Sequence, residues 1–244
     1  MEIPHTPRIG TAGWSAPHER AAAFPAGGST LERYAARFDA AEINSSFYRP
    51  HRRSTYERWA ASVPEHFRFA VKLPRAITHD QRLVATDVLL DVFLEEARGL
   101  GDRFGPLLVQ LPPSLVFQPD VAGQFFAELR TVHAGAVVCE PRHASWGSTE
   151  ADALLASLRI ARVAADPARW PGAERTGGWP GLVYARLHGS PRIYYSSYDE
   201  SSLATVAEMM RAGARAAAEC WCVFDNTASG AATGNALALG TMLT

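Results

Sequence analysis

The sequence has no hydrophobic run long enough to cross a bilayer as a helix, which takes about eighteen consecutive apolar residues. Its N-terminal segment MEIPHTPRIG lacks the charged stretch and the following apolar stretch of a secretory signal. These two absences leave no sequence feature that would anchor or export the chain. We therefore expect a cytoplasmic protein without a membrane partner.

Cysteine is scarce, with only Cys139, Cys220 and Cys222 in the chain. The number is odd, each residue lies in an apolar run, and no CxxC or mixed Cys/His spacing is present. A disulfide framework and a structural zinc site are therefore not indicated. We expect three buried, reduced thiols.

Neither sign of charge is in excess, because the formal net charge of the 244 residues is −1. This balance gives no bulk attraction to nucleic acid or to anionic lipid. The chain is 47% hydrophobic and 20% charged, which is typical of a globular protein rather than a disordered one. No linker or low-complexity tract divides it, so we interpret residues 1–244 as a single domain.

Short apolar runs, bounded by turn residues, alternate with longer amphipathic stretches. This alternation is typical of βα units around a parallel sheet. Several runs are apolar on consecutive residues, which indicates strands that are covered on both faces. The expected strands are 8–14, 40–48, 67–74, 106–113, 136–143, 160–166, 182–189 and 220–226.

Candidate helices lie between these runs. Residues with good N-cap side chains precede or open most of them, and STLE and STYE have the spacing of a capping box. The expected N-caps are Ser29 or Thr30, Ser54, Asp120 and Ser148. The expected helices are 29–38, 54–61, 83–99, 120–130, 148–158 and 199–218.

Eight strands in a chain of this length match the size of a (β/α)8 barrel. The segment 167–181, PARWPGAERTGGWPG, is too rich in glycine and proline for a helix, so the sixth crossover is expected to be irregular. A doubly wound open sheet is the alternative, but no GxGxxG or Walker sequence follows the first run. We predict an α/β fold, a TIM-barrel-like (β/α)8 domain.

Nearly every expected strand ends in a polar or ionisable side chain, whereas the strand beginnings carry ordinary residues. In a barrel, the carboxyl ends of all strands lie at one rim, where active sites of this fold are built. A single polar residue at such a position can be only a cap or a turn residue, as for Asn44 or Asp225. As a set they predict a functional rim of Trp14, Glu42, Asn44, Lys72, Gln110, Glu140, Arg142, His143, Asp166, Arg186, His188, Asp225 and Asn226.

Five of these residues are candidate catalytic groups: Glu140, His188, Lys72, Glu42 and Asp166. A carboxylate at the mouth of an apolar barrel is suited to acid/base work, and we predict Glu140 as the leading base or nucleophile. His188 is the expected partner acid, because histidine titrates near neutral pH. Lys72 is the expected charge stabiliser. The alternative is a set of structural salt bridges across the barrel mouth.

Two arginines and one loop are candidate binding elements. Arg142 and Arg186 offer planar guanidinium groups for a phosphate or a carboxylate. After the seventh strand, HGSPRIYYSSYD brings Tyr194 and Tyr195 together with small residues. Such a loop forms a polar aromatic wall or a mobile lid, and loop packing is the alternative.

A phosphate site is predicted after the eighth strand, in DNTASGAATGNAL. A glycine-rich turn there precedes a helix start, where free backbone N–H groups favour anions. Barrels often bind phosphate at this corner. Ser229 and Gly230 are the candidate phosphate-binding residues, and a plain capping turn is the alternative.

No cofactor is identified, and a divalent metal stays an open alternative. The oxygen and nitrogen ligands for one would come from Glu42, Glu140, Asp166, His79 and His188. No HxH, HExxH or paired-cysteine spacing supports such a site.

One local basic cluster lies in RPHRRSTYERW, residues 49–59. Most such runs are solvated surface. This one follows the second strand and so falls at the predicted rim, which keeps contact with a phosphate backbone open as an alternative that we do not favour.

The chain resembles the YecE-like family, domain-of-unknown-function family 72. The motifs that carry the resemblance are IGTAGWS, AEINSSFYRP, FRFAVKLPRAITH, GPLLVQLPPS, EPRHASW, RLHGSPRIYYSSYD and FDNTASGAATGNAL. The resemblance implies a TIM-barrel-like fold with a cavity at the carboxyl ends of the strands. It adds Tyr48, His79 and Trp146 to the polar lining, beside the strand-end residues named above.

The resemblance brings no settled reaction, so the function is predicted from the residues. We predict an enzyme that acts by acid/base chemistry on a small polar substrate, phosphorylated and sugar-like or nucleotide-like, as an isomerase, lyase or hydrolase. One alternative is a phosphodiester-processing or nucleic-acid-binding barrel that uses a metal. A second alternative is a non-catalytic protein that binds small molecules. The sequence does not specify an oligomeric state.

Overall fold

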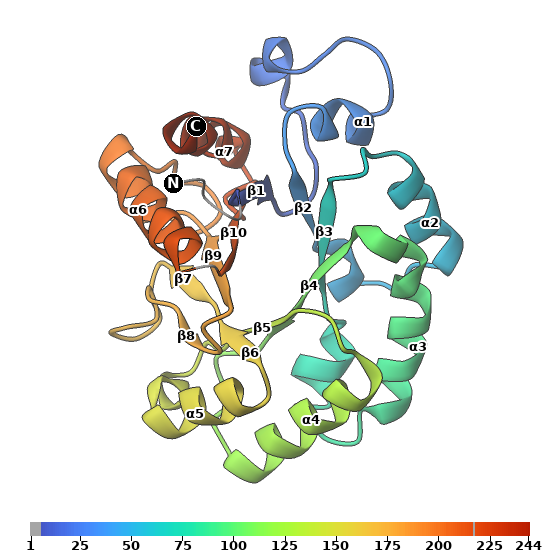
Figure 1. The fold of residues 1–244 in the computed structure, drawn as a ribbon, viewed down its shortest axis with the longest axis vertical. Helices are drawn as coiled ribbons and strands as arrows, with labels where there is room; N and C mark the ends of the chain where they lie inside the picture. Colours follow the sequence, from blue (N-terminus) through green and yellow to red (C-terminus); the bar gives the residue numbers. More distant parts are fainter. Residues whose placement is uncertain (1–5, 217) are drawn as a thin grey trace.

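The structure is a computed structural model that describes residues 6–216 and 218–244. Strands and helices alternate along most of the chain (Figure 1). The strands are β1 (Arg8–Thr11), β2 (Ala40–Ile43), β3 (Arg68–Lys72), β4 (Phe104–Gln110), β5 (Val137–Glu140), β6 (Ile160–Arg162), β7 (Ala164–Asp166), β8 (Gly177–Gly178), β9 (Leu182–Leu187) and β10 (Glu219–Phe224).

The helices lie mainly between these strands. Short 3-10 or π turns cover residues 18–23, 45–47, 76–80, 98–103 and 144–147. The α-helices are α1 (Thr30–Ala35), α2 (Arg53–Ala61), α3 (Asp87–Ala97), α4 (Pro119–Val132), α5 (Thr149–Ser157), α6 (Glu200–Arg215) and α7 (Ala231–Leu243). The segment 167–181 holds only turns and the two-residue strand β8, so the predicted irregular sixth crossover is confirmed.

The hydrogen-bonded strands fall into two sheets. One has the order β1-β10-β9-β7 and the other β2-β3-β4-β5-β6-β8, and every pairing is parallel except that of β6 with β8. The predicted α/β fold with parallel strands is therefore confirmed. The predicted closed eight-stranded barrel is not shown. The sheets meet at an isolated bridge between Ala12 and Glu42, and β6 and β7 are separated by Val163 alone.

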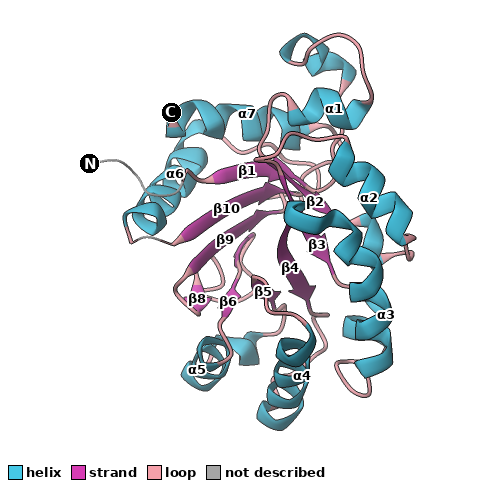
Figure 2. Ribbon diagram, turned by 45° about the vertical axis from the view of Figure 1, so that its right-hand side comes forward, coloured by secondary structure: helices cyan, strands magenta, loops and turns pink. Residues whose placement is uncertain are grey.

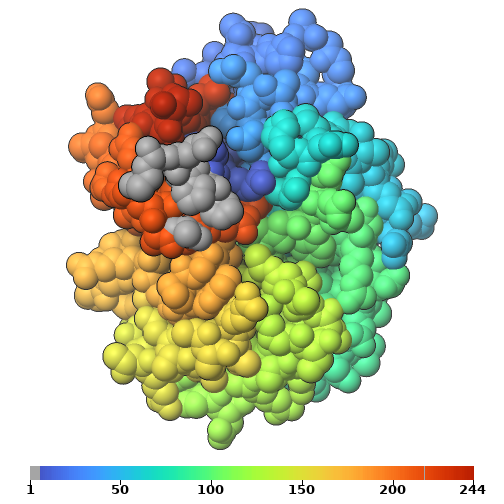
Figure 3. Space-filling view, viewed as in Figure 1, coloured from blue at the N-terminus to red at the C-terminus, as the bar shows by residue number. Residues whose placement is uncertain are grey.

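The strands lie inside the molecule and the helices cover them from outside (Figure 2). Successive segments follow one another around the molecule, so the red C-terminal part lies beside the blue N-terminal part in Figure 3. Helix α7 packs against β1 accordingly. This circular order brings strand ends that are distant in the sequence close together in space.

Two hydrophobic cores result from the alternation of side chains along each strand. The outer core lies between the strands and the helices and contains, for example, Phe69, Val109 and Phe224. The inner core is smaller and consists of Ala40, Ala70, Leu108, Val138, Ala161, Val163, Ala165, Leu182, Tyr184, Trp221 and Val223. The inner core is apolar along the strands and gives way to charged side chains at their carboxyl ends.

The predicted helix starts are confirmed in part. Ser29 and Glu32 form the capping box of α1, and the side chain of Ser148 caps α5. The STYE box does not form, because α2 already begins at Arg53, one residue before Ser54. Similarly, α4 begins at Pro119, which places Asp120 inside its first turn. The expected helix 83–99 starts only at Asp87 because positive φ angles at residues 82, 83 and 85 interrupt it.

Gly10 in β1 lies where the two sheets come closest. A β-carbon at this position would overlap the carbonyl oxygen of Ala40 in β2. We expect Gly10→Ala to lower the free energy of unfolding by about 1 to 3 kcal/mol, because one strand must move away from the other. Urea denaturation checks this value.

The matched control is Gly123→Ala in α4, where the added β-carbon meets only an ordinary contact with Leu154. Alanine is the better helix former, so this variant should be as stable as the wild type or more stable. Equal stability of the Gly10→Ala variant and the wild type would contradict the close approach of β1 and β2.

The fold also bears on the cysteines and on membrane spans. Cys139, Cys220 and Cys222 are buried and free, as predicted. Within residues 6–216 and 218–244, no helix combines the length and the apolar character that a membrane crossing requires.

Candidate active site

The polar strand ends converge on the inner face of the sheets. Each of these side chains except His188 lies two residues after an inner-core residue, and therefore on the same face of the strand, and His188 lies two residues after Arg186. Examples are Glu42 after Ala40, and Glu140 after Val138. The buried polar residues placed in this way are Glu42, Lys72, Gln110, Glu140, Arg186, His188 and Asp225, which we call the charged cluster.

Arg186 lies at the centre of the charged cluster and is fully buried. Its guanidinium is bidentate to Glu42, with Nε 3.0 Å from Oε2 and Nη2 2.7 Å from Oε1. Nη1 donates to Oε2 of Glu140 at 3.0 Å, and Nη2 lies 3.0 Å from Oδ2 of Asp225. One guanidinium thus supplies the positive charge that three buried carboxylates need. These contacts raise the pKa of Arg186 in spite of its burial.

His188 joins two of these carboxylates. Its Nε2 lies 3.0 Å from Oε1 of Glu140, and its Nδ1 lies 3.0 Å from Oδ2 of Asp225. An ionised carboxylate only accepts hydrogen bonds, so both contacts are satisfied together when the ring carries both protons. The cluster can therefore hold a proton between Glu140 and Asp225.

Glu140 accepts hydrogen bonds from four side chains. Besides Arg186 and His188, its carboxylate accepts from Nε2 of Gln110 at 3.0 Å and from Nε of Arg142 at 3.2 Å. Burial alone would raise the pKa of Glu140, but the charges of Arg186, His188 and Arg142 hold it well below its usual value. Glu140 therefore fits the role of a fixed negative charge better than that of a base.

The remaining carboxylates are held in the same manner. Burial favours the neutral form of Asp225, yet Arg186 and His188 lower the pKa of this residue. Glu42 also accepts a hydrogen bond from the phenol of Tyr184, at 3.1 Å. The network is thus closed by side chains from β2, β5, β9 and the residue that follows β10.

Lys72 is the exception in this network. Its side chain is only 4% exposed, yet within residues 6–216 and 218–244 its amine makes no hydrogen bond or ion pair with the protein. The ammonium nitrogen lies 4.1 Å from the centre of the Phe47 ring. Burial, and then the positive charge of Arg186, outweigh the nearby carboxylates and lower the pKa of Lys72 to about 8.

The amino-acid composition, rather than the strand pattern, distinguishes Lys72 from the other basic residues. Lys72 is the only lysine in the chain, and every other basic residue among the 24 lysines and arginines is arginine. Arginine stays charged in proteins, whereas a buried lysine can lose its proton near neutral pH. The one position that carries a lysine is thus the one where a titratable amine lies in the charged cluster.

His79, in the turn at 76–80, contacts the same Phe47 ring as Lys72 does. Its ring contacts the Phe47 ring edge-on at 4.9 Å between centres, and its Nδ1 lies 2.9 Å from the hydroxyl of Thr78. Burial and the positive charges of Lys72, Arg75 and Arg142 lower the pKa of His79 to about 4. His79 is therefore neutral at pH 7 and a weak base.

Partly exposed polar residues lie above the cluster. The ring of Tyr194 stands edge-on to that of His188, with centres 6.1 Å apart, and its phenol interacts with Arg142. Asn44 follows β2 directly, and its buried Oδ1 has no hydrogen-bond partner in the described part of the chain. His143 accepts from the backbone N–H of Ser145 at 3.2 Å. Arg142, Tyr194 and Asn44 leave polar groups available above the cluster.

Asp166 does not join the charged cluster. Its Oδ1 accepts from the phenol of Tyr198 at 2.8 Å, and it lines a separate cavity of about 560 Å³ between β7, β9 and α6. Trp14 packs edge-on against Trp59 and Phe69 in the outer core. The structure therefore separates both residues from the cluster, because their side chains leave the strands on the outer side.

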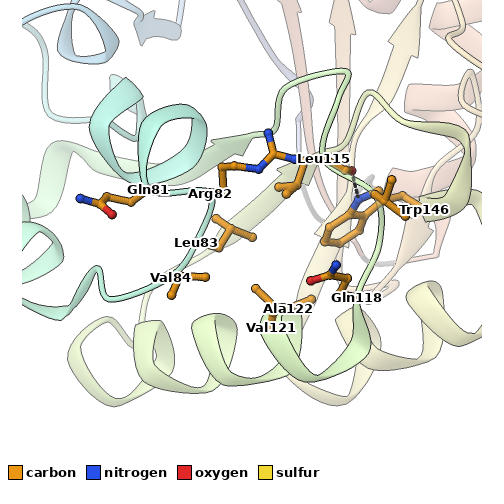
Figure 4. Close-up of a pocket in the computed structure, with 10 residues that line it drawn as sticks. Gln81, Arg82, Leu83, Val84, Leu115, Gln118, Val121, Ala122 and Trp146 are labelled. Carbon is orange, nitrogen blue, oxygen red and sulfur yellow. Dashed lines mark hydrogen bonds between the residues drawn. The ribbon is translucent and has the colours of Figure 1, made fainter.

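Tyr48 and Trp146 also lie elsewhere. Tyr48 is 73% exposed and lines a groove beside α3. Trp146 is buried and donates its indole N–H to the carbonyl of Leu115 at 3.0 Å. It borders a cavity of about 320 Å³ next to α4, and Figure 4 shows its ring facing Gln118 there. Trp146 thus holds a loop in place and is not part of the cluster.

The predicted phosphate site at Ser229 and Gly230 forms a capping turn beside the 190–198 loop. The hydroxyl of Ser229 donates to the carbonyl of Tyr195 at 2.8 Å, and Gly230, with φ of +75°, is the N-cap of α7. Tyr195 lies under the guanidinium of Arg192, 3.9 Å away. Asn226 donates to the carbonyl of Ser196 at 2.8 Å. These contacts tie the 190–198 loop to the start of α7, and phosphate binding there stays a prediction.

The arrangement gives little support to the metal alternative. Among the residues described, no group of three or more histidine, cysteine, aspartate or glutamate side chains is placed to hold a metal ion. Glu42, Glu140 and Asp225 instead surround the guanidinium of Arg186, which supplies the charge that a cation would provide. A divalent metal stays an untested alternative.

The basic cluster at 49–59 is partly neutralised. Arg53 pairs with Glu57 at 3.0 Å and with Glu95 at 2.6 Å. His51 is 9% exposed and lies 2.8 Å from the hydroxyl of Ser45. These contacts leave fewer free charges for a phosphate backbone than the sequence suggests.

Asp225 was placed in the predicted rim, with a cap or turn residue as the alternative, and it belongs to the charged cluster. It is 5% exposed and bonds both Arg186 and His188. Its position two residues after Val223 of the inner core could have revealed its direction. Tyr184 and Phe47 were not among the predicted site residues, because an aromatic side chain in an expected strand usually belongs to the core.

A family model described as protein of unknown function DUF72 matches residues 8–244. The chain belongs to the DUF72 family. This result confirms the resemblance to the YecE-like family, which the sequence motifs indicate. The family description assigns no reaction to DUF72 proteins.

Among curated relatives, the UPF0759 protein YecE of Escherichia coli is 33% identical over 84 residues. The match covers 34% of this chain and 31% of YecE, so less than a third of that relative is spanned. A crystal structure of a DUF72 family protein from Thermotoga maritima aligns with a TM-score of 0.81 and 24% identity, covering 98% of this chain and 99% of that one. Another, from Enterococcus faecalis, has a TM-score of 0.82 and 21% identity, covering 99% of both chains. These DUF72 structures share the fold.

Proposed function

We propose that this protein is an enzyme that carries out acid/base chemistry on a small, polar, anionic substrate at the charged cluster. The observation that supports this most is the buried amine of Lys72, which makes no ion pair within the described residues. Its pKa of about 8 lets it hold or release a proton close to neutral pH. Sugar phosphates and nucleotides are the substrate classes that we favour.

The roles of the cluster residues follow from their contacts. Lys72 transfers the proton, and His79, which is neutral at pH 7, offers a hydrogen-bonding group to the substrate. Arg142 binds the anionic group of the substrate, since it lies above the cluster with its side chain 13% exposed. Glu140 was predicted as the leading base, but its four hydrogen bonds favour a positioning role instead.

We further propose that the two sheets act as one barrel-like wall around this site. The bridge between Ala12 and Glu42 and the short step from β6 to β7 support this interpretation. In such a wall the charged cluster lies at the carboxyl ends of the strands, where (β/α)8 enzymes bind their substrates.

Proton nuclear magnetic resonance in D₂O tests the proposed function, because it detects a reaction whatever the product is. The purified protein is incubated with dihydroxyacetone phosphate, ribose 5-phosphate, glucose 6-phosphate and AMP. We expect loss of a C–H signal, or new product signals, for at least one of these compounds. Lys72→Met should slow that change at least about 100-fold, since a positioned acid or base contributes a factor of this size.

Arg215→Met is the matched control, because Arg215 lies exposed on α6 and pairs with Glu208, which is not part of the charged cluster. This variant should keep the rate of the wild type. The proposal is wrong if the wild type changes none of the four compounds, or if Lys72→Met keeps the full rate.

A nucleic-acid-processing role stays an alternative prediction, and the ion pairs of Arg53 do not favour it. A purely binding role differs from the proposed one in a single respect. It leaves every compound unchanged in D₂O while still shifting the resonances of the protein.

A further inference from the structure

We propose that Lys72 forms a covalent imine with the aldehyde or ketone carbon of a small anionic substrate. This inference rests on the proposed function and deepens it by naming the substrate class. Its basis is the placement of one unpaired amine among fixed charges, beside a neutral histidine and below an arginine.

The first support is the freedom of the amine. Imine formation needs a nitrogen lone pair, which a lysine in an ion pair does not offer. Glu42, Glu140 and Asp225 are all near enough to influence Lys72, yet each is bonded to Arg186 instead. The guanidinium satisfies the carboxylates and leaves the amine unpaired in the described part of the chain.

The second support is the choice of residue. A permanent positive charge at the end of β3 would be supplied by arginine, which this chain uses at every other basic position. Arginine carries no nucleophilic amine at neutral pH, whereas a lysine next to another cation does. The one lysine therefore stands where a nucleophile, rather than a charge, is needed.

The third support is the neighbourhood of the new bond. An imine that carries a proton is a cation, and the carboxylates of Glu42, Glu140 and Asp225 favour a positive charge on this nitrogen. The ring of Phe47, 4.1 Å from the nitrogen, also favours a cation. These groups offset part of the cost that burial and Arg186 place on a positive charge at this nitrogen, so the site leaves the amine free at the start and still accommodates the charged imine.

The step balances without an oxidant or a reductant. The nitrogen lone pair forms a bond to the carbonyl carbon, and the electron pair of the C=O π bond moves to oxygen. One proton passes from nitrogen to that oxygen, and a second proton from solvent lets it depart as water while the C=N bond forms. The nitrogen keeps its last proton, and solvent at the site carries the protons between nitrogen and oxygen.

The substrate also carries an anionic group. Arg142 uses Nε to bond Glu140, and its guanidinium reaches the phenol of Tyr194, which is 40% exposed. Within residues 6–216 and 218–244 no carboxylate other than that of Glu140 pairs with Arg142. The rest of this guanidinium is suited to a carboxylate or a phosphate. A carbonyl carbon and an anion in one small molecule define the class.

Reductive trapping tests the imine directly, and the sequence makes the result simple to assign. The full-length protein is incubated at pH 7.5 with sodium cyanoborohydride and one of four probes: pyruvate, glyoxylate, dihydroxyacetone phosphate or glyceraldehyde 3-phosphate. Intact mass and peptide mapping locate the adduct. Only Lys72 and the N-terminal amine can form one, because the chain has no other lysine.

We expect an adduct at Lys72 with at least one probe, and the carboxylate and phosphate probes distinguish the two kinds of anion. At pH 7.5 about a quarter of an amine with a pKa near 8 is neutral, against about one in a thousand for an ordinary lysine. Adduct formation at Lys72 should therefore be roughly 100-fold faster in the folded protein than in guanidinium chloride. The Lys72→Arg variant keeps a positive charge at this position and should form no adduct at residue 72.

The absence of a Lys72 adduct with all four probes, including the case of an adduct at the N-terminal amine alone, overturns the inference. So does a Lys72 adduct that forms no faster in the folded protein than in the unfolded one. Proton exchange in D₂O without trapping leaves the proposed acid/base function standing and removes the imine. Trapping without any change in D₂O keeps the imine and removes the proposed turnover, so the two failures are distinguishable.

Discussion

Replacing Arg186 with methionine is expected to lower the free energy of unfolding by about 3 to 5 kcal/mol. The guanidinium is fully buried and bonds the carboxylates of Glu42, Glu140 and Asp225. Methionine fills a similar volume but leaves three negative charges without their shared partner. The loss of stability is larger than the lost attraction alone, because the remaining carboxylates stay buried away from water without this partner.

Urea denaturation at pH 7 measures this loss, with Arg192→Met as the matched control. Arg192 is an exposed arginine that lies over the Tyr195 ring, so its replacement should change the stability by no more than about 0.5 kcal/mol. Adding Glu42→Gln to Arg186→Met should restore part of the loss, because one stranded charge is then removed. An Arg186→Met variant within about 1 kcal/mol of the wild type would show that the network contributes little.

The charged cluster could be predicted from the sequence because strand periodicity determines it. An alternating strand that is apolar at Val138 and charged at Glu140 places both side chains on one face. The same reasoning applies to Ala70 with Lys72 and to Leu108 with Gln110. Parallel strands then bring these ends together, whatever their separation along the chain.

The residues beyond the strand ends could not be placed in this way. Trp146 and Asp166 follow or end strands in the sequence, yet one packs under a loop and the other bonds Tyr198. Their directions depend on loop and helix packing, which has no period in the sequence. The sequence also does not predict how the two sheets meet, because this depends on individual strand pairings such as that of Ala12 with Glu42.

The roles within the cluster were the least predictable part. Carboxylates were assigned the chemistry because they are the usual bases, but Arg186 bonds Glu42, Glu140 and Asp225 and leaves Lys72 unpaired in the described part of the chain. Which charges pair depends on differences of about an ångström in the distances between side chains, and these differences follow only from the packed structure. The composition still held one usable signal, the solitary lysine.

The same lysine leads to the second large prediction, which concerns stability and pH. Burial and Arg186 lower the pKa of Lys72 from 10.5 to about 8, so the folded state binds this proton less tightly than the unfolded state. Below pH 8 both states carry the proton, and the folded protein holds an unfavourable buried charge. We therefore expect Lys72→Met to be more stable than the wild type at pH 7, by about 3 kcal/mol.

The difference should disappear as the pH rises. Between about pH 8 and pH 10.5 the folded state loses the proton while the unfolded state still holds it, so wild-type stability increases relative to the variant. Above this window both states are neutral and the gap between the two proteins stays constant. Groups outside the surroundings of Lys72 titrate in both proteins alike, and the carboxylates of Glu140 and Asp225 and the ring of His79 have pKa values below this pH window.

Urea denaturation of the wild type and Lys72→Met at pH 7, 8, 9 and 10, with a reductant present, measures the gap. Arg215→Met serves as the control and should show a constant difference from the wild type, because arginine keeps its charge over this range. A gap between the wild type and Lys72→Met that does not change with pH would mean that Lys72 holds its proton as an exposed lysine does. A free amine near neutral pH, and with it both the acid/base role and the imine, would then lose its physical basis.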